Sequence, residues 1–153
     1  MSKDKQIYIA SGFENRGLLI PLIDKIYEKI PNIVIRATWI TAPPTKYQMD
    51  VERDFREIDM SDVILAYFPY GTGTLCEVSY AHGLGKYVGV LTDLYYYKGG
   101  NLDGVEYSSH FPLVRATKWP FKQKWTPTNI LPKFIYAYNF NDQMDWLKLV
   151  CEK

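Results

Sequence analysis

The sequence has few cysteines and histidines and almost no net charge, and each of these features marks a specialised class of protein when it is abundant. Its 153 residues include 2 cysteines and 2 histidines, and the formal net charge is only +1. Cys76 and Cys151 have no metal-ligand spacing, which argues against a disulfide framework or a zinc site. A near-neutral charge argues against a nucleic-acid polymer or an anionic membrane as partner. No run reaches membrane-spanning length and the N-terminus lacks a signal peptide's apolar core, so we expect a cytoplasmic protein.

The bulk composition is that of an ordinary globular protein. Hydrophobic residues make up 47% of the chain and charged residues 23%, and the length suits one domain over residues 1–153. The 13 tyrosines can stack on planar ligands or fill a subunit interface, and composition does not distinguish these uses. Residues 118–128 are basic, aromatic and interrupted by proline, but one such patch on a near-neutral chain is weak support for nucleic-acid binding.

Apolar periodicity predicts a regular alternation of strands and helices up to Leu91. Beyond that point the pattern loosens into a predicted long loop over residues 92–109. Because strands and helices alternate, we expect an α/β, doubly wound, mostly parallel five-stranded sheet with helices on both faces. Pro132 makes an edge position or an irregular segment the expectation for residues 130–140. The expected strands are 6–10, 33–40, 63–68, 87–91 and 111–116, and the expected helices are 18–30, 48–60, 75–84 and one capped by Asn141 or Asp142.

The stretch from Asp62 to Leu91 organises the functional prediction. A buried strand is followed by a glycine-spaced turn, Gly71-Thr72-Gly73-Thr74, and by a helix with Glu77 in its expected first turn. In open α/β sheets ligands bind beyond the carboxyl ends of the strands, where this glutamate is expected. The helix N-terminus favours an ionised carboxylate. Glu77 is therefore a candidate nucleophile, or it only complements the helix dipole.

The sequence lacks the motifs of several common catalytic chemistries, and the remaining candidate is catalysis by carboxylates. There is no dinucleotide fingerprint, phosphate loop or nucleophile elbow, so we expect neither a cofactor nor a metal. Glu77, Asp54 on the preceding helix and Tyr8 in the first strand all fall near strand ends. Taken singly, Tyr8 is a core aromatic and Asp54 a solvated helix residue. The three form a site only if the first and third strands lie side by side, as they do at a switch point.

Three segments together resemble the nucleoside 2-deoxyribosyltransferase family, which includes related nucleoside and nucleotide N-glycoside hydrolases. The segments are IYIASGF, RDFREIDMSDVILAYF and GTGTLCEVSYAHGLGKYVGVL, and they span roughly the first two thirds of the chain. The most specific part is Glu-x-x-Tyr-Ala-x-x-x-Gly-Lys, which begins at Glu77. The resemblance implies a flavodoxin-like fold.

The resemblance also implies roles for particular residues. Glu77 matches the family's nucleophile, Tyr8 the tyrosine that orients it, and Asp54 a catalytic-site aspartate. Gly12 allows close approach of the backbone, and Phe13 matches an aromatic placed against the base. Asn101 matches a residue that a neighbouring subunit lends to the sugar. Gly71, Thr72 and Gly73 are candidate substrate-binding residues because the free amides of a turn before a helix can hold an anion.

The implied reaction is a double displacement on a 2′-deoxynucleoside through a glycosyl ester on Glu77, with transfer to another base or to water. The expected partners are a nucleoside or nucleotide, a free nucleobase and further copies of the chain in a homo-oligomer with shared active sites. One departure affects base recognition, because Gly71 or Thr72 stands where many of the transferases carry an aspartate. A hydrolase of nucleoside 5′-monophosphates and a nucleotide-binding module without catalysis therefore stay open.

Overall fold

The protein is built around one six-stranded sheet in which every strand pair is parallel. The structure is a computed structural model that describes residues 4–42, 45, 47–68, 72–92, 116–120 and 130–153. The strand order is β2-β1-β3-β4-β6-β5. The strands are β1 (Lys5–Ser11), β2 (Ile33–Arg36), β3 (Val63–Tyr67), β4 (Tyr87–Leu91), β5 (Thr117–Lys118) and β6 (Phe134–Ala137).

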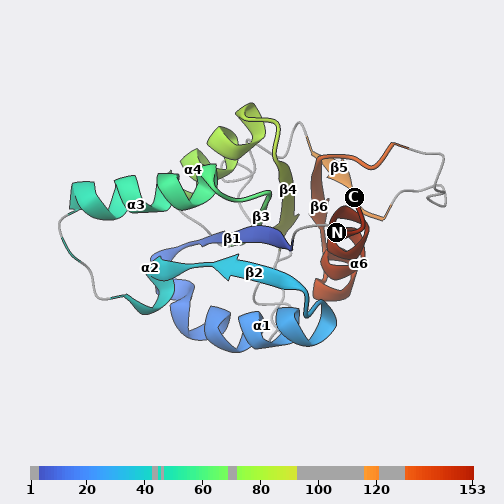
Figure 1. The fold of residues 1–153 in the computed structure, drawn as a ribbon, viewed down its shortest axis with the longest axis horizontal. Helices are drawn as coiled ribbons and strands as arrows, with labels where there is room; N and C mark the ends of the chain where they lie inside the picture. Colours follow the sequence, from blue (N-terminus) through green and yellow to red (C-terminus); the bar gives the residue numbers. More distant parts are fainter. Residues whose placement is uncertain (1–3, 43–44, 46, 69–71, 93–115, 121–129) are drawn as a thin grey trace.

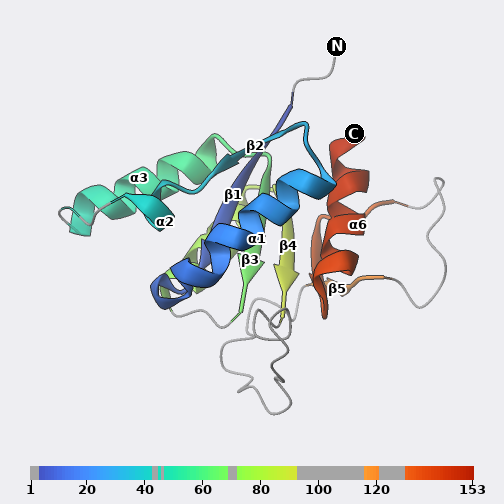
Figure 2. The ribbon, with the colours of Figure 1, turned by 90° about the horizontal axis from the view of Figure 1, so that it is seen from below.

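Helices cover both faces of the sheet, as the alternating pattern predicts. Figure 1 shows α3 and α4 above the strands and α1 and α6 below them, and Figure 2 gives the same arrangement from below. The fold is therefore the predicted α/β, flavodoxin-like architecture. The helices are the short 3-10 helix η1 (Phe13–Asn15), α1 (Arg16–Lys29), α2 (Thr38–Thr41), α3 (Tyr47–Asp59), α4 (Thr72–Gly83) and α6 (Phe140–Cys151).

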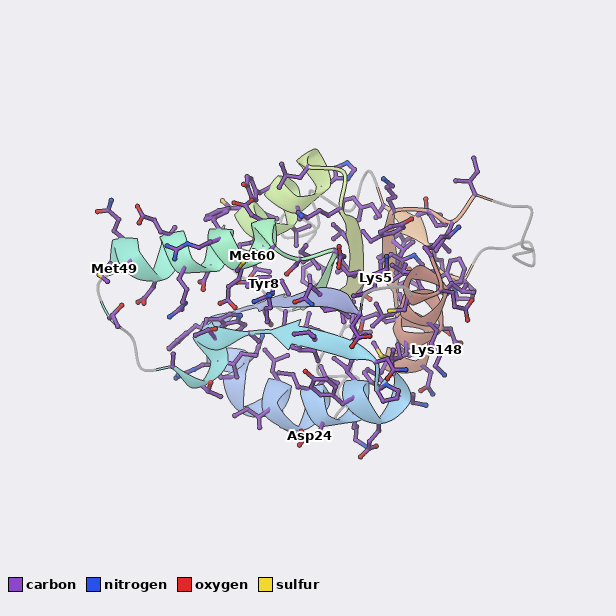
Figure 3. All side chains as sticks on the ribbon, in the orientation of Figure 1. Lys5, Tyr8, Asp24, Met49, Met60 and Lys148 are labelled. Atoms are coloured by element: carbon purple, nitrogen blue, oxygen red, sulfur yellow. The ribbon has the colours of Figure 1, made fainter. Side chains whose placement is uncertain are left out.

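The two central strands have the sequence character of strands buried on both faces. All five residues of β3 are buried, and β1 pairs with β3 along its length from Ile7 to Ser11. The predicted adjacency of the first and third strands is thus confirmed. Alternate residues of a strand point to opposite faces of the sheet. Tyr8 of β1 faces α3 and α4 (Figure 3), whereas Gly89 of β4 packs against Trp146 of α6 on the other face.

Four expectations about the elements need correction. In the described part of the chain the sheet has six strands instead of five. The second strand ends at Arg36 instead of Ile40, because residues 38–41 turn into α2 and Trp39 Nε1 donates a buried 2.8 Å hydrogen bond to the Ile9 carbonyl. Residues 134–137 form β6 between β4 and β5, so this strand is not at an edge. The last helix is capped by Asn139, whose side chain accepts from the Asp142 amide.

The ends of α4 give one confirmation and one correction. Gly85 has a φ of +75°, the left-handed conformation that glycine adopts at little cost, and it ends the helix as predicted. The helix begins at Thr72, however, so Thr72 to Thr74 form its first turn and not a loop. The predicted strand over residues 111–116 and the loop over 92–109 lie almost wholly outside the described residues. None of the helices in the described part of the chain is both long and apolar enough to cross a bilayer.

Candidate functional site

Tyr8 lies at the centre of a polar cluster between the sheet and the helices above it. Its side chain is 0% exposed, on the face of β1 that α3 covers (Figure 3). Burial raises the pKa of Tyr8 far above its ordinary value of 10, and the carboxyl groups of Glu77, Asp54 and Glu57 raise it further. The hydroxyl therefore stays protonated at any working pH, and it can serve a neighbouring carboxylate as a hydrogen-bond donor.

Glu77 reaches this cluster from the second turn of α4. It is the sixth residue of the helix, so the expectation that it lies in the first turn is wrong, and the helix dipole has little effect at that distance from the end. Burial raises the pKa of Glu77 from 4.5 to about 7, Tyr8 opposes the shift, and Asp54 adds to it. The helix end was predicted to stabilise the ionised form of Glu77, but burial disfavours that form.

The Tyr8 hydroxyl and Glu77 Oε2 are both buried, and neither has a hydrogen-bond partner of good geometry among the described residues. The two groups nevertheless lie close enough for a side-chain hydrogen bond between them to contribute to the pKa shifts of both. The pair is thus placed face to face. Such contacts in unliganded sites often tighten when a substrate binds.

Asp54 joins the cluster from α3, and Arg53 holds its position. Nε and Nη2 of Arg53 donate hydrogen bonds of 3.2 and 3.1 Å to Asp54 Oδ1. Burial raises the pKa of Asp54 above its ordinary value, although the Arg53 guanidinium lowers it. The predicted trio of Tyr8, Asp54 and Glu77 is therefore gathered in one corner, with electrostatic coupling among all three.

Glu57 of α3 is a member of the cluster that the sequence pattern does not single out. The residue is only 7% exposed, and Thr38 Oγ1 donates a 3.1 Å hydrogen bond to its Oε2. Its Oε1 is buried without a hydrogen-bond partner in the described part of the chain, at 4.0 Å from Arg53 Nε. The one available signal was its position three residues after Asp54, which puts both side chains on the same side of a helix.

The predicted substrate-binding residues have mixed outcomes. Gly12 is buried at the end of β1, and Phe13 is 51% exposed with the Arg16 guanidinium carbon 3.7 Å from its ring centroid. Gly73 is exposed in the first turn of α4. Thr72 begins that helix, and its side chain is not described. Gly71 and Asn101 lie outside the described residues.

A polar groove is separate from this cluster. It lies between α1 and the start of α6, is lined by Lys25, Glu28, Lys29 and residues 139–142, and includes none of the clustered side chains. In the ranges that the structure describes, no group of three or more His, Cys, Asp or Glu side chains is arranged to hold a metal. The carboxyl cluster is thus the site with the chemistry for acid–base or nucleophilic work.

The fold and this site define a flavodoxin-like α/β protein with a partly buried carboxyl cluster at the β1–β3 switch point. No protein-family model matches the chain, and no curated protein matches it. Among solved structures, a conserved protein from Enterococcus faecalis V583 has 15% identity and a TM-score of 0.52, with 95% of this chain and 87% of that chain covered. The 2-desoxiribosyltransferase from Leishmania mexicana has 23% identity and a TM-score of 0.49, with 67% of this chain and 77% of that chain covered. At the Enterococcus protein's level of identity the likeness shows the fold alone.

Proposed function

We propose that the protein cleaves the N-glycosidic bond of a 2′-deoxynucleoside through a covalent ester on Glu77. The deoxyribosyl group then passes to a second nucleobase or to water. The observation that carries the proposal is the Glu77 carboxyl, whose Oε2 is buried without a partner of good geometry among the described residues, and which is coupled to both Tyr8 and Asp54. The sequence resemblance to the nucleoside 2-deoxyribosyltransferase family supports the same reaction.

In the first step an ionised Glu77 oxygen forms a bond to the anomeric carbon while the bond from that carbon to the base nitrogen breaks. The transition state resembles an oxocarbenium ion, which a nearby carboxylate stabilises. Tyr8 donates its hydroxyl hydrogen to the other carboxylate oxygen, and so orients the nucleophile. Because its pKa is raised far above 10, Tyr8 does not compete as an anion.

The departing base needs a proton at the nitrogen that leaves the sugar, and Asp54 is the group proposed to supply it. Burial raises the pKa of Asp54, which helps it to hold a proton. In the second step the incoming base or a water molecule returns a proton to Asp54 and attacks the same carbon. The ester bond to Glu77 breaks, so the two displacements retain the configuration of the sugar.

The direct test is mass spectrometry of the protein after incubation with 2′-deoxynucleosides and their 5′-monophosphates, with chromatography of the released bases. We expect a deoxyribosyl adduct on Glu77. We also expect Glu77→Ala to lose activity by at least about 10³-fold, since the nucleophile is absent. Glu52→Gln, which changes an exposed glutamate of α3, is the control and should behave as the wild type.

Activity of Glu77→Ala within a few-fold of the wild type would remove Glu77 from this role. Reversible binding of nucleosides without release of base would favour a binding module. Base release from the monophosphates but not from the nucleosides would favour a nucleotide hydrolase. Asn101 lent by a second subunit would make the monomer inactive, which chromatography of the active species by size would test.

A further inference from the structure

Arg36 is the last residue of β2, and it lies directly beside Tyr8. The two are paired in the parallel register of β1 and β2, so their side chains leave the same face of the sheet. Arg36 Nε is buried and has no hydrogen-bond partner among the described residues. A buried guanidinium nitrogen without an acceptor is costly, and such a group calls for an explanation.

Unpartnered polar atoms are concentrated in this corner of the molecule. Seven buried side-chain nitrogen or oxygen atoms lack a hydrogen-bond partner in the described ranges, and four belong to the corner: Tyr8 Oη, Arg36 Nε, Glu57 Oε1 and Glu77 Oε2. Two others are on Tyr67 and Gln143 at the opposite face, where Gln143 acts on the Tyr67 hydroxyl as Glu77 acts on Tyr8 in the corner. The four atoms in the corner are one donor, two acceptors and a hydroxyl, which suits a polar ligand that has both kinds of group.

The corner lies on the side of the site where the nucleobase must sit. In the proposed reaction Asp54 protonates the departing base, and Asp54 is carried by α3. The helix α2 begins two residues after Arg36 and contacts α3, where Thr38 donates to Glu57. Figures 1 and 2 both place α2 beside α3 at the end of β2. A base in reach of Asp54 is therefore also on the Arg36 side of Tyr8.

The charges in the corner favour a neutral acceptor over a phosphate. The carboxyl groups of Glu77, Asp54 and Glu57 all act electrostatically on the Tyr8 hydroxyl, and Arg53 already bonds Asp54. Three acids on this face of the sheet would repel a dianion. A carbonyl oxygen and a ring nitrogen carry no net charge and still accept from a guanidinium.

We propose that Arg36 recognises the nucleobase, and that it selects bases with a carbonyl at the hydrogen-bonding edge over bases with an amino group there. The inference rests on the function proposed above and names the substrate class of that same site. The guanidinium is a planar donor that pairs with two neighbouring acceptors, as in its recognition of O6 and N7 of guanine. An amino group at the same place on the base presents a hydrogen to a donor, and the contact is lost.

Matched pairs of substrates isolate this contact. 2′-Deoxyinosine and 2′-deoxyadenosine differ in the carbonyl or amino group at position 6 and in the hydrogen that the carbonyl form carries on N1. 2′-Deoxyuridine and 2′-deoxycytidine differ in the same way at position 4 and N3. We expect the wild type to have a kcat/KM about 10-fold or more higher for the carbonyl member of each pair. Arg36→Gln should abolish or invert this preference with the purines, since an amide pairs with the edge of adenine.

Arg36→Lys keeps the charge but loses the planar fork, so its preference should be intermediate. Arg56→Gln, the same change at an exposed position of α3, is the control and should keep the wild-type preference. Circular dichroism establishes that each variant is folded, and Arg36→Lys carries the test if Arg36→Gln is not folded. Equal preferences in the wild type, or a wild-type preference that survives both changes at Arg36, would overturn the inference while leaving the glycosyl reaction in place. Absence of base release from every substrate would overturn both.

Discussion

Replacing Glu77 by glutamine tests the effect of burial on the pKa of this carboxyl, independently of any substrate. Burial raises the pKa of Glu77 from 4.5 to about 7. Between these two values the native protein holds a proton that the unfolded chain releases. The free energy of unfolding therefore falls as the pH rises through this window. Glutamine has nearly the shape of the protonated acid and cannot ionise, so the variant does not share this loss.

The size of the effect follows from the shift. A difference of about 2.5 pH units corresponds to roughly 3.4 kcal/mol, since each unit is about 1.36 kcal/mol. The contribution is fully present below pH 4.5 and is lost as the pH rises through about 7. Between pH 5 and pH 8 the wild type should lose about 2.5 kcal/mol relative to Glu77→Gln. Relative to the wild type, Glu77→Gln is thus expected to gain stability as the pH rises, because the wild type must then keep a buried charge.

The assay is urea unfolding of both proteins at pH 5, 6, 7 and 8, followed by circular dichroism. The quantity compared is the difference in unfolding free energy between the two proteins at each pH. Glu52→Gln on the exposed side of α3 is the control, because it removes a carboxyl of the same kind without the burial. Parallel pH profiles for the wild type and Glu77→Gln would refute the reasoning, since they would mean that Glu77 titrates alike in the native and unfolded states.

Two further predictions follow from contacts in the structure. Tyr8→Phe removes the hydroxyl that lowers the pKa of Glu77. The acidic limb of the profile of kcat/KM against pH, expected near pH 7 in the wild type, should therefore move to higher pH. An unmoved limb would mean that Tyr8 does not act on the group that titrates. Gly89→Ala would place a Cβ 2.5 Å from Cζ3 of the fully buried Trp146 and should destabilise the protein by about 1–3 kcal/mol in urea unfolding. Gly17→Ala meets no atom within 4 Å and is the matched control; an equal effect of both changes would contradict the packing argument.

The fold was predictable wherever a local apolar pattern decides the structure. The run from Val63 to Tyr67 is buried throughout, and its sequence alone indicates a strand covered on both faces. The end of β2 was not predictable in this way. Residues 37–40 have the composition of a strand, but Trp39 bonds to the Ile9 carbonyl and turns the chain into α2. That contact joins positions 30 residues apart, which a local period cannot reveal.

The site was predictable as a set of residues and not as an electrostatic environment. The topology brings Tyr8, Asp54 and Glu77 together because β1 and β3 are neighbours. The start of α4 at Thr72 moves Glu77 into the second turn, so burial and not the helix end sets its pKa. The burial of Glu57 depends on Thr38 in α2, and the sequence pattern predicted a strand there.

The acid–base properties of the unliganded site constrain the proposed mechanism. Burial raises the pKa of both Glu77 and Asp54, and the two hydrogen bonds from Arg53 to Asp54 oppose the shift at Asp54. Burial thus favours the protonated form of both acids, whereas the reaction needs an ionised Glu77 and a protonated Asp54. A bound base that accepts a hydrogen bond from protonated Asp54 favours the neutral form of that acid and so helps to divide the two roles. The two apparent pKa values of the pH–rate profile then belong to the coupled pair and not to either residue alone.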